Sequence, residues 1–305
     1  MFTRILVPTD FSRPSDAAQV YARRLATYTG ATIHLLHVVD NLFLRAVLAD
    51  PHDYEAAALR RLQDRTPAGA DITSILAVER SDAPADEITS YARAHAIDLI
   101  VMGTHGRGRM AHLLLGSVAE KVARTAPCPV LTMRDAPHVD DLKGIRILVP
   151  TDFSPSADAA LGCARRLAAR LFGSIRLLHV VEHPGFDASY GSELSVPEIT
   201  AVREQQVTHA RTDLSSRSLV DDHSRVRITG DVLLGPSAAM IADYAGDNGF
   251  DLIVMGTRGR GGFARLLIGS VAESIIRTAP CPVLTVKDVE TAAVVRLDVA
   301  AGAVA

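Results

Sequence analysis

Short runs of apolar residues alternate along this chain with longer segments in which polar and apolar positions mix. The first half carries such runs at residues 5–8, 32–39, 72–78, 98–102 and 130–133. After an opening run around Leu148, the second half repeats them at 174–181, 226–233, 251–255 and 283–286. Uninterrupted runs of this length are typical of parallel strands buried on both faces. They predict an α/β fold in which each half forms a doubly wound, five-stranded parallel sheet.

The segments between these runs predict helices, several with recognisable starts. Ser12 and Ser154, each followed closely by a proline, are expected to cap the first helix of each half. Ser117 and Ser270 each precede a glutamate by three residues, which predicts a capping box at the start of the last helix. The remaining predicted helices are two long amphipathic segments, at 44–65 and 197–219, and two shorter segments at 84–95 and 236–248.

Two motifs recur at fixed places and divide the chain. The sequence Leu-Val-Pro-Thr-Asp-Phe-Ser occurs at 6–12 and 148–154, and Ala-Pro-Cys-Pro-Val-Leu-Thr at 126–132 and 279–285. The separations are 142 and 153 residues, so the second half carries 11 additional residues between its second and third strands, which we assign to the loop at 182–194. We predict domains at 1–134 and 145–288, a linker at 135–144 and an unassigned tail at 289–305.

A glycine-rich stretch, Gly103 to Ser117, returns as Gly256 to Ser270. Both copies read G-x-x-G, nine residues, then G-S, between the end of a strand and the start of a helix. Glycine there lets the backbone approach a ligand and adopt positive φ, and the helix start favours an anion such as phosphate. Nearby arginines add positive charge: Arg107, Arg109, Arg258, Arg260 and Arg265. The alternative, packing turns kept by duplication, explains the glycines but not the arginines.

Asp10 and Asp152 follow the first strand of each half, at the edge of the sheet where the glycine stretches also lie. The two carboxylates are candidates for ligand contact, or alternatively turn formers that accept local backbone N–H groups. His37 and His179 lie inside apolar strands, where a hydrogen-bonded structural role is the better interpretation. The backbone at the ends of these strands is a candidate to read an adenine edge.

Composition narrows the classes of function. The formal net charge is −3 without a strong basic block and tryptophan is absent, which argues against nucleic acid or a membrane surface as a partner. The three cysteines, Cys128, Cys163 and Cys281, have no metal-ligand spacing and are interpreted as reduced thiols. No segment approaches the roughly 20 apolar residues that cross a bilayer. We therefore expect a soluble cytoplasmic protein.

Taken together, the paired Val-Pro-Thr-Asp-Phe-Ser, Leu-Leu-His-Val-Val, glycine and Pro-Cys-Pro-Val-Leu motifs resemble those of the universal stress protein family over nearly the whole chain. The resemblance implies two tandem Rossmann-like, adenine nucleotide alpha hydrolase-like domains, whose fifth strands pair with each other. Members that bind ATP carry the glycine motif, so it implies one ATP site per domain. A further dimer of such chains is also expected.

The resemblance assigns nucleotide contacts residue by residue. Those of the first site are Thr9, Asp10, Val39, Met102, Gly103, His105, Gly106, Arg107, Gly108, Arg109, Gly116, Ser117 and Val118. Those of the second site are Thr151, Asp152, Val181, Met255, Gly256, Arg258, Gly259, Arg260, Gly261, Gly269, Ser270 and Val271. The two loops differ where His105 corresponds to Arg258, so the two affinities are expected to differ.

Neither glycine stretch contains a lysine to reach the β- and γ-phosphates, which argues against an efficient ATPase. Asp10 and Asp152 are more plausible as ligand contacts or indirect Mg²⁺ contacts than as bases. The predicted function is an ATP-binding regulator of the stress response. A slow ATP hydrolase that acts as a timer, and an interaction module that binds no nucleotide, are the alternatives.

Overall fold

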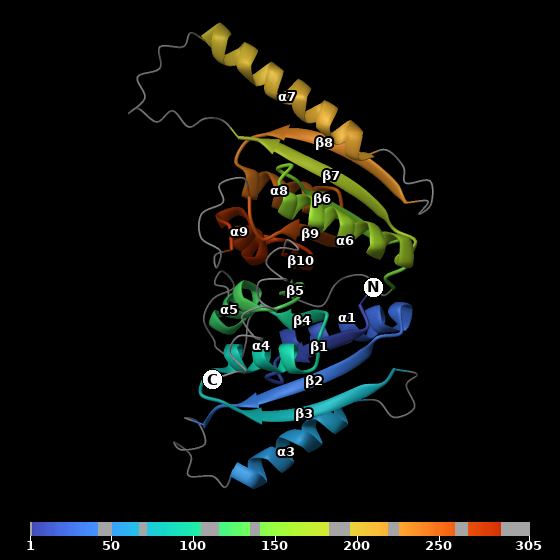
Figure 1. Cartoon of the computed structure of the whole chain (residues 1–305), viewed down its shortest axis with the longest axis vertical. Helices are drawn as coiled ribbons and strands as arrows, with labels where there is room; N and C mark the ends of the chain where they lie inside the picture. Colours follow the sequence, from blue (N-terminus) through green and yellow to red (C-terminus); the bar gives the residue numbers. More distant parts are fainter. Residues whose placement is uncertain are drawn as a thin grey trace, which may run out of the picture.

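The computed structural model describes residues 2–41, 51–66, 72–104, 116–134, 141–182, 196–218, 226–259 and 268–287. Its strands form one ten-stranded sheet in the order β3-β2-β1-β4-β5-β10-β9-β6-β7-β8 (Figure 1). The strands of the first half are β1 (Arg4–Pro8), β2 (Thr32–Val39), β3 (Ser74–Arg80), β4 (Leu99–Gly103) and β5 (Val130–Met133). Those of the second half are β6 (Arg146–Pro150), β7 (Ser174–Val181), β8 (Arg227–Leu234), β9 (Leu252–Gly256) and β10 (Val283–Val286).

Neighbouring strands within each half are parallel, which confirms the predicted doubly wound sheets. Helices pack on both faces. One face is covered by α1 (Arg13–Thr29), α3 (Pro51–Asp64), α6 (Pro155–Leu171) and α7 (Val196–Ser218). The other face is covered by α4 (Pro84–Ala94), α5 (Ser117–Thr125), α8 (Ser237–Asp247) and α9 (Ser270–Thr278).

The apolar runs are continuous because both faces of the sheet are buried. In β1, Ile5 and Val7 belong to a core under α1 and α3, whereas Leu6 between them belongs to a core under α4 and α5. The core under α1 continues into the second half under α6, where it includes Leu161. The long helix α7 contributes little to it, because Ala210 and Leu214 are its buried side chains in the described part.

The two halves meet at their fifth strands. β5 and β10 pair antiparallel, with Leu131 opposite Leu284, as the resemblance implied. Thr285 Oγ1 donates to the carbonyl oxygen of Val130 (3.1 Å) across this junction. One sheet therefore runs through both halves, and the strands that end it are β3 and β8 (Figure 1).

Two cations reinforce the junction. Lys287, directly after β10, donates from Nζ to the carbonyl oxygens of Arg124 (2.8 Å) and Ala126 (2.6 Å) at the end of α5. Arg134, directly after β5, donates from Nη1 to the carbonyl oxygen of Arg277 (3.1 Å) near the end of α9. Each half thus supplies a cation to the C-terminal end of a helix in the other half, where the helix dipole favours positive charge.

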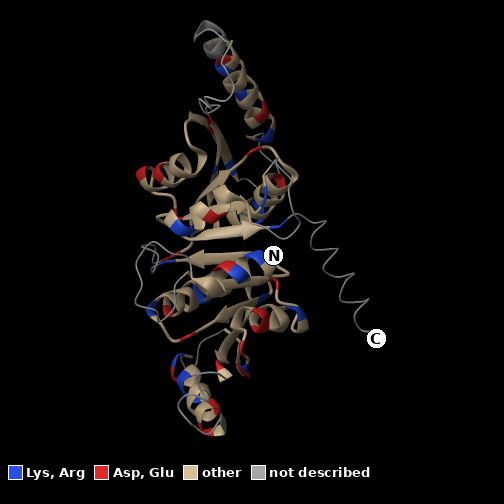
Figure 2. Ribbon diagram, turned by 90° about the vertical axis from the view of Figure 1, so that its left-hand side faces the viewer, with Lys and Arg blue, Asp and Glu red and all other residues tan. Residues whose placement is uncertain are grey.

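The surface carries both signs of charge. Basic and acidic residues are interspersed over the helices of both halves (Figure 2). Among the residues that the structure describes, no helix is long and apolar enough to span a membrane. The same residues contain no group of three or more histidine, cysteine or acidic side chains placed to hold a metal ion.

A buried histidine sets the first half apart. His34 in β2 lies with Nδ1 3.1 Å from Tyr91 Oη, and Tyr91 stacks on His95 at 3.8 Å between ring centroids. Burial, together with His95 and Arg4 nearby, lowers the pKa of His34. The second half has Arg176 at the equivalent position. Lowering the pH should therefore destabilise the first half through protonation of His34, which has no histidine counterpart in the second half.

Replacing Lys287 by Ala should lower the free energy of unfolding at pH 7 by about 1–3 kcal/mol, because two carbonyls at the helix end lose their donor. Burial lowers the pKa of Lys287 to about 8, so its ammonium group is largely charged at that pH. Denaturant unfolding measures the loss, with Lys143→Ala as the control because Lys143 is exposed. Equal midpoints for the two variants would show that the contacts do not hold the halves together.

A lowered pKa at His34 means that the unfolded chain binds a proton more readily than the folded chain. The stability present above about pH 6.5 is therefore lost as the pH falls towards the folded-state pKa. We expect the free energy of unfolding to drop between pH 7 and pH 5 by more in the wild type than in His34→Gln. Denaturant titrations across this range measure both curves, and parallel curves would contradict the assignment.

Candidate functional site

The second domain contains a cleft of about 430 Å³ at the carboxyl ends of its central strands. It lies where β6 stands between β7 and β9, the point at which the strand order reverses and open α/β sheets bind ligands. The cleft is lined by Pro150, Thr151, Asp152, Ala157, Leu178, His179, Val180, Ser237, Ile241, Met255, Gly256, Thr257, Arg258, Gly259, Ile268, Gly269, Ser270, Val271 and Ala272.

Nine of the residues predicted for the second site line this cleft. They are Thr151, Asp152, Met255, Gly256, Arg258, Gly259, Gly269, Ser270 and Val271. Val181 does not line it, and its neighbour Val180 does. The Val181 carbonyl oxygen instead accepts a bond from the Gly235 N–H (3.1 Å), as Val39 does from Ser81 (3.1 Å). Arg260 and Gly261 lie outside the described residues.

The helix α8 contributes a wall of the cleft that was not predicted from the sequence. Ser237 and Ile241 are one helical turn apart on α8 and face Leu178 and Val180, which alternate along β7. Such spacings select one face of a helix and one face of a strand. The two periodicities were the available signal, and they favour Val180 over Val181 as a lining side chain.

The helix α9 begins at the cleft without a side-chain cap. Its N-cap is Gly269, which has no side chain to accept a hydrogen bond, and the next three residues line the cleft. The N–H group of Gly269 itself donates to Thr257 O (2.8 Å), which closes the base of the glycine loop. The first turn of a helix has N–H groups without partners inside the helix, so this end favours an anion.

The start of α8, which also lines the cleft, already has a carboxylate beside it. The N–H group of Ser237, at the start of α8, donates to Glu182 Oε1 (3.1 Å). A carboxylate therefore occupies the place where a second anion would bind. A ligand with one charged and one apolar end would direct its charge to α9 and its apolar part toward Ile241, Val180 and Met255.

Both aspartates at the strand tips form turns, and Asp152 also lines the cleft. Asp152 Oδ1 accepts a bond from the Ser154 N–H (3.1 Å), and Asp10 Oδ1 accepts from the Ser12 N–H (3.0 Å) and Oγ (2.5 Å). Asp152 Oδ2 lies so close to Gly259 that a Cβ there would be 3.0 Å away. Asp152 therefore forms a turn and lines the cleft at the same time.

Glycine is needed at the first motif position for packing. A Cβ on Gly256 would lie 2.4 Å from Ser156 Oγ and 2.8 Å from its carbonyl carbon, and one on Gly103 would lie 2.7 Å from Pro14 Cβ. These positions admit only glycine because the first helix of each domain packs on the strand end. The packing interpretation therefore accounts for two of the glycines.

The expected positive φ is wrong for the motif glycines that the structure describes. Gly116 and Gly269 each have φ −63°, and the positive-φ glycines are instead Gly30, Gly144, Gly235 and Gly249. The predicted capping boxes are also wrong. Ser117 and Ser270 are the first residues of their helices, because the glycine before each of them occupies the N-cap position. The caps at Ser12 and Ser154 are in place, although only Ser154 bonds a helix N–H, that of Ala157 (3.3 Å).

The first domain repeats the base of this site. The N–H of Gly116 donates to Thr104 O (2.8 Å), as Gly269 does to Thr257, and Ser117 and Val118 begin α5. Thr9 and Asp10 directly follow β1, and Met102 and Gly103 end β4 beside it. The predicted loop residues lie outside the described residues: His105, Gly106, Arg107, Gly108 and Arg109.

The strand histidines have the structural role predicted for them. His37 Nδ1 lies 2.7 Å from the carbonyl oxygen of Thr9, and His179 Nδ1 lies 2.7 Å from that of Thr151. A carbonyl only accepts, so each imidazole donates from Nδ1. Each histidine therefore fixes the turn that follows the first strand of its domain.

Comparison with known proteins gives one consistent result. The profile of the universal stress protein family matches residues 1–134 and 145–287. Over 296 residues, the chain is 26% identical to a universal stress protein of Mycolicibacterium smegmatis. The alignment covers 93% of this chain and 96% of the relative. It is also 36% identical to a universal stress protein of Thermus aquaticus over 140 residues, 44% of this chain and 100% of the relative.

Solved structures share the whole fold. A universal stress protein from Archaeoglobus fulgidus aligns with a TM-score of 0.63 and 22% identity, over 93% of this chain and 98% of its own. A functionally unknown protein from Pseudomonas aeruginosa aligns with a TM-score of 0.67 and 19% identity, over 97% and 96%. At these identities the likeness establishes the tandem two-domain fold.

Two glycines of the second site should respond differently to a methyl group. Gly256→Ala forces a Cβ against the backbone of Ser156 and should lower the free energy of unfolding by about 1–3 kcal/mol. Gly269→Ala should cost less than about 1 kcal/mol, since its Cβ would lie at 3.5 Å from Thr257 O, an ordinary contact. Denaturant unfolding compares them, and equal losses would refute the packing role of Gly256.

Proposed function

Because the chain belongs to the universal stress protein family, we propose that it binds ATP, one molecule in the cleft of each domain. Nucleotide occupancy then alters the stability, shape or partner choice of the protein, which acts as a regulator of the stress response. The observation that carries the proposal is the cleft of the second domain. It combines an apolar end with a helix start that lacks a side-chain cap, beside Arg258.

The chemistry of the cleft suits a nucleotide in one orientation. The phosphates would meet the N–H groups at the start of α9 and the guanidinium of Arg258, and the loop residues Arg260 and Gly261 would add to this end. The adenine ring would lie toward Met255 and Ile241, because the helix start at that end is already bonded to Glu182. Asp152, which also lines the cleft, would accept bonds from the ribose.

The first site would use the corresponding residues of the first domain. Thr9, Asp10, Met102 and Val38, the counterpart of Val180, would surround the nucleoside. Residues 103–109 with Gly116, Ser117 and Val118 would hold the phosphates. If His105 reaches the phosphates, the first site gains positive charge as the pH falls through about 6.5, whereas Arg258 is charged throughout. The two affinities then differ most at high pH.

Magnesium fits this site only as a companion of the phosphates. The described residues offer no cluster of three candidate ligands, so Asp152 and the equivalent Asp10 would contact the ion singly or through water. Mg²⁺ ordinarily keeps several waters and binds nucleotide phosphates with one or two carboxylates. When bound, it would neutralise part of the phosphate charge.

Slow turnover is the second candidate function. Neither glycine stretch has a lysine to reach the β- and γ-phosphates, which argues against efficient turnover. Binding with at most slow hydrolysis is therefore the better account. An interaction module without nucleotide would leave the cleft of the second domain without a ligand.

Titration with ATP and with adenosine tests this orientation. Arg258→Ala should weaken ATP at one of the two sites by roughly tenfold, the loss of one charge-assisted bond, and leave adenosine nearly unchanged. Arg277→Ala, on the same domain but at the far end of α9, is the control. Equal losses for ATP and adenosine would show that Arg258 does not contact phosphate.

A further inference from the structure

A phenylalanine stands in a left-handed backbone conformation beside each of the two aspartates. Phe11 has φ 65° and Phe153 has φ 64°, in the turns Thr-Asp-Phe-Ser that follow β1 and β6. Residues with a Cβ avoid this region, which is occupied mainly by glycine and, less often, by asparagine. A bulky residue in this conformation in both domains requires contacts that hold it there.

In the second domain, two side chains hold the ring of Phe153. His179 stacks on it with 4.6 Å between ring centroids, and the guanidinium carbon of Arg217, at the end of α7, lies 5.0 Å from its centroid. Arg217 is itself fixed, because its Nε donates to Asp158 Oδ1 (2.9 Å) on α6. A cation over an aromatic face is attracted by the ring.

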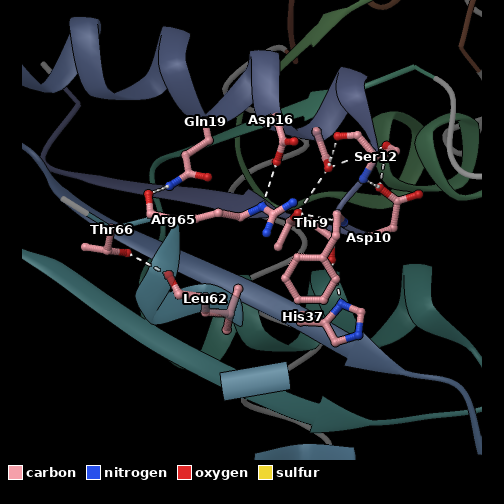
Figure 3. Close-up of polar contacts among 11 residues, drawn as sticks. Thr9, Asp10, Ser12, Asp16, Gln19, His37, Leu62, Arg65 and Thr66 are labelled. Atoms are coloured by element: carbon pink, nitrogen blue, oxygen red, sulfur yellow. Dashed lines mark hydrogen bonds and ion pairs between the residues drawn. The ribbon is translucent and has the colours of Figure 1, made fainter. Parts of the chain in front are cut away.

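The first domain builds the same arrangement (Figure 3). The ring centroids of His37 and Phe11 lie 4.4 Å apart. Two guanidinium carbons lie over the Phe11 ring, that of Arg61 at 4.0 Å and that of Arg65 at 5.0 Å from its centroid. Arg65 Nε donates to Asp16 Oδ1 (2.9 Å), and Gln19 Nε2 donates to the Arg65 carbonyl oxygen (2.9 Å). Figure 3 shows Arg65 reaching across from the α3 side to the turn that carries Asp10.

Both halves of the internal repeat keep this clamp, which we define as the left-handed phenylalanine, the histidine and arginine against its ring, and the aspartate that binds the arginine. Asp16 and Asp158 are 142 residues apart, as are the two turns. Arg65 and Arg217 are 152 residues apart, as are the buried pairs Ala58 and Ala210 and Leu62 and Leu214 on the same two helices, because the longer loop of the second half precedes α7. The arginines therefore stand at equivalent positions at the C-terminal ends of α3 (Pro51–Asp64) and α7 (Val196–Ser218), although the two helices differ in length.

The clamp acts on the carboxylate through the backbone. In the second domain, the Phe153 N–H donates to Thr151 Oγ1 (3.0 Å) and the Ser154 N–H to Asp152 Oδ1 (3.1 Å). His179 holds the Thr151 carbonyl on the other side of Asp152. Fixing Phe153 therefore fixes the direction in which the Asp152 side chain leaves the turn, at the wall of the cleft.

We infer that Phe153 and Arg217 are positioning residues that hold Asp152 for the nucleoside part of the ligand. Phe11 and Arg65 do the same for Asp10. This inference rests on the proposed nucleotide sites. It makes the C-terminal ends of α3 and α7 part of the binding apparatus, although α7 is otherwise a largely exposed helix.

Two-site titrations of the full chain with ATP and with adenosine test this role. Arg217→Ala and Phe153→Asn, which tolerates the left-handed conformation, should each weaken one of the two sites about tenfold. The factor should be the same for both ligands because a nucleoside contact is lost. Arg211→Ala, an exposed arginine on the same helix, should leave both sites unchanged.

A double-mutant cycle separates positioning from general loss of structure. In an Asp152→Asn background, Arg217→Ala should change affinity less than twofold, because the carboxylate it positions is gone. The same tenfold loss in that background, or unaltered affinity in Arg217→Ala while the wild type binds, would overturn the inference alone. If the wild type bound neither ligand, the proposed function would fail and the inference with it. If Phe153→Asn does not fold, the Arg217→Ala variant by itself tests whether Asp152 is positioned in this way.

Discussion

Pairing of β5 with β10 is the interaction on which the rest of this structure depends. Each half ends in an apolar strand that, by itself, would present unpaired backbone groups at a sheet edge. Joining Val130–Met133 to Val283–Val286 removes both edges and leaves β3 and β8 to end the sheet. The antiparallel junction also brings Lys287 and Arg134 to helix ends of the opposite half. One sheet with two equivalent switch points follows, and the candidate sites lie at those points.

At each switch point, packing and binding use different residues of one motif. Gly103 and Gly256 leave room for the first helix of their domain, whereas Gly116 and Gly269 start a helix without supplying a side-chain cap. The anion preference of the cleft in the second domain then comes from the start of α9. The start of α8 does not compete for the anion, because the Ser237 N–H there already donates to Glu182. The Asp152 carboxylate at the cleft wall belongs to a turn that the bonds from Ser154 and His179 fix.

Much of this could be predicted from the sequence, for physical reasons. Strands buried on both faces leave continuous apolar runs, so β2 and β7 were predicted at 32–39 and 174–181 without error. Capping boxes were predicted wrongly because serine and glutamate fit the pattern whether or not a glycine takes the N-cap position before them. The left-handed Phe11 and Phe153 run against local preference, and their arginine partners Arg65 and Arg217 lie 54 and 64 residues further along the chain. Contacts of that kind become visible only when the helices are placed in space.

Protein purified without added nucleotide, then denatured and analysed for what it releases, tests most directly whether both domains bind ATP. Two molecules of ATP per chain are the predicted result, with any ADP present in minor amount. Absence of nucleotide, together with no binding when ATP is titrated into the purified chain, would contradict the proposed function and leave the glycine loops as packing turns.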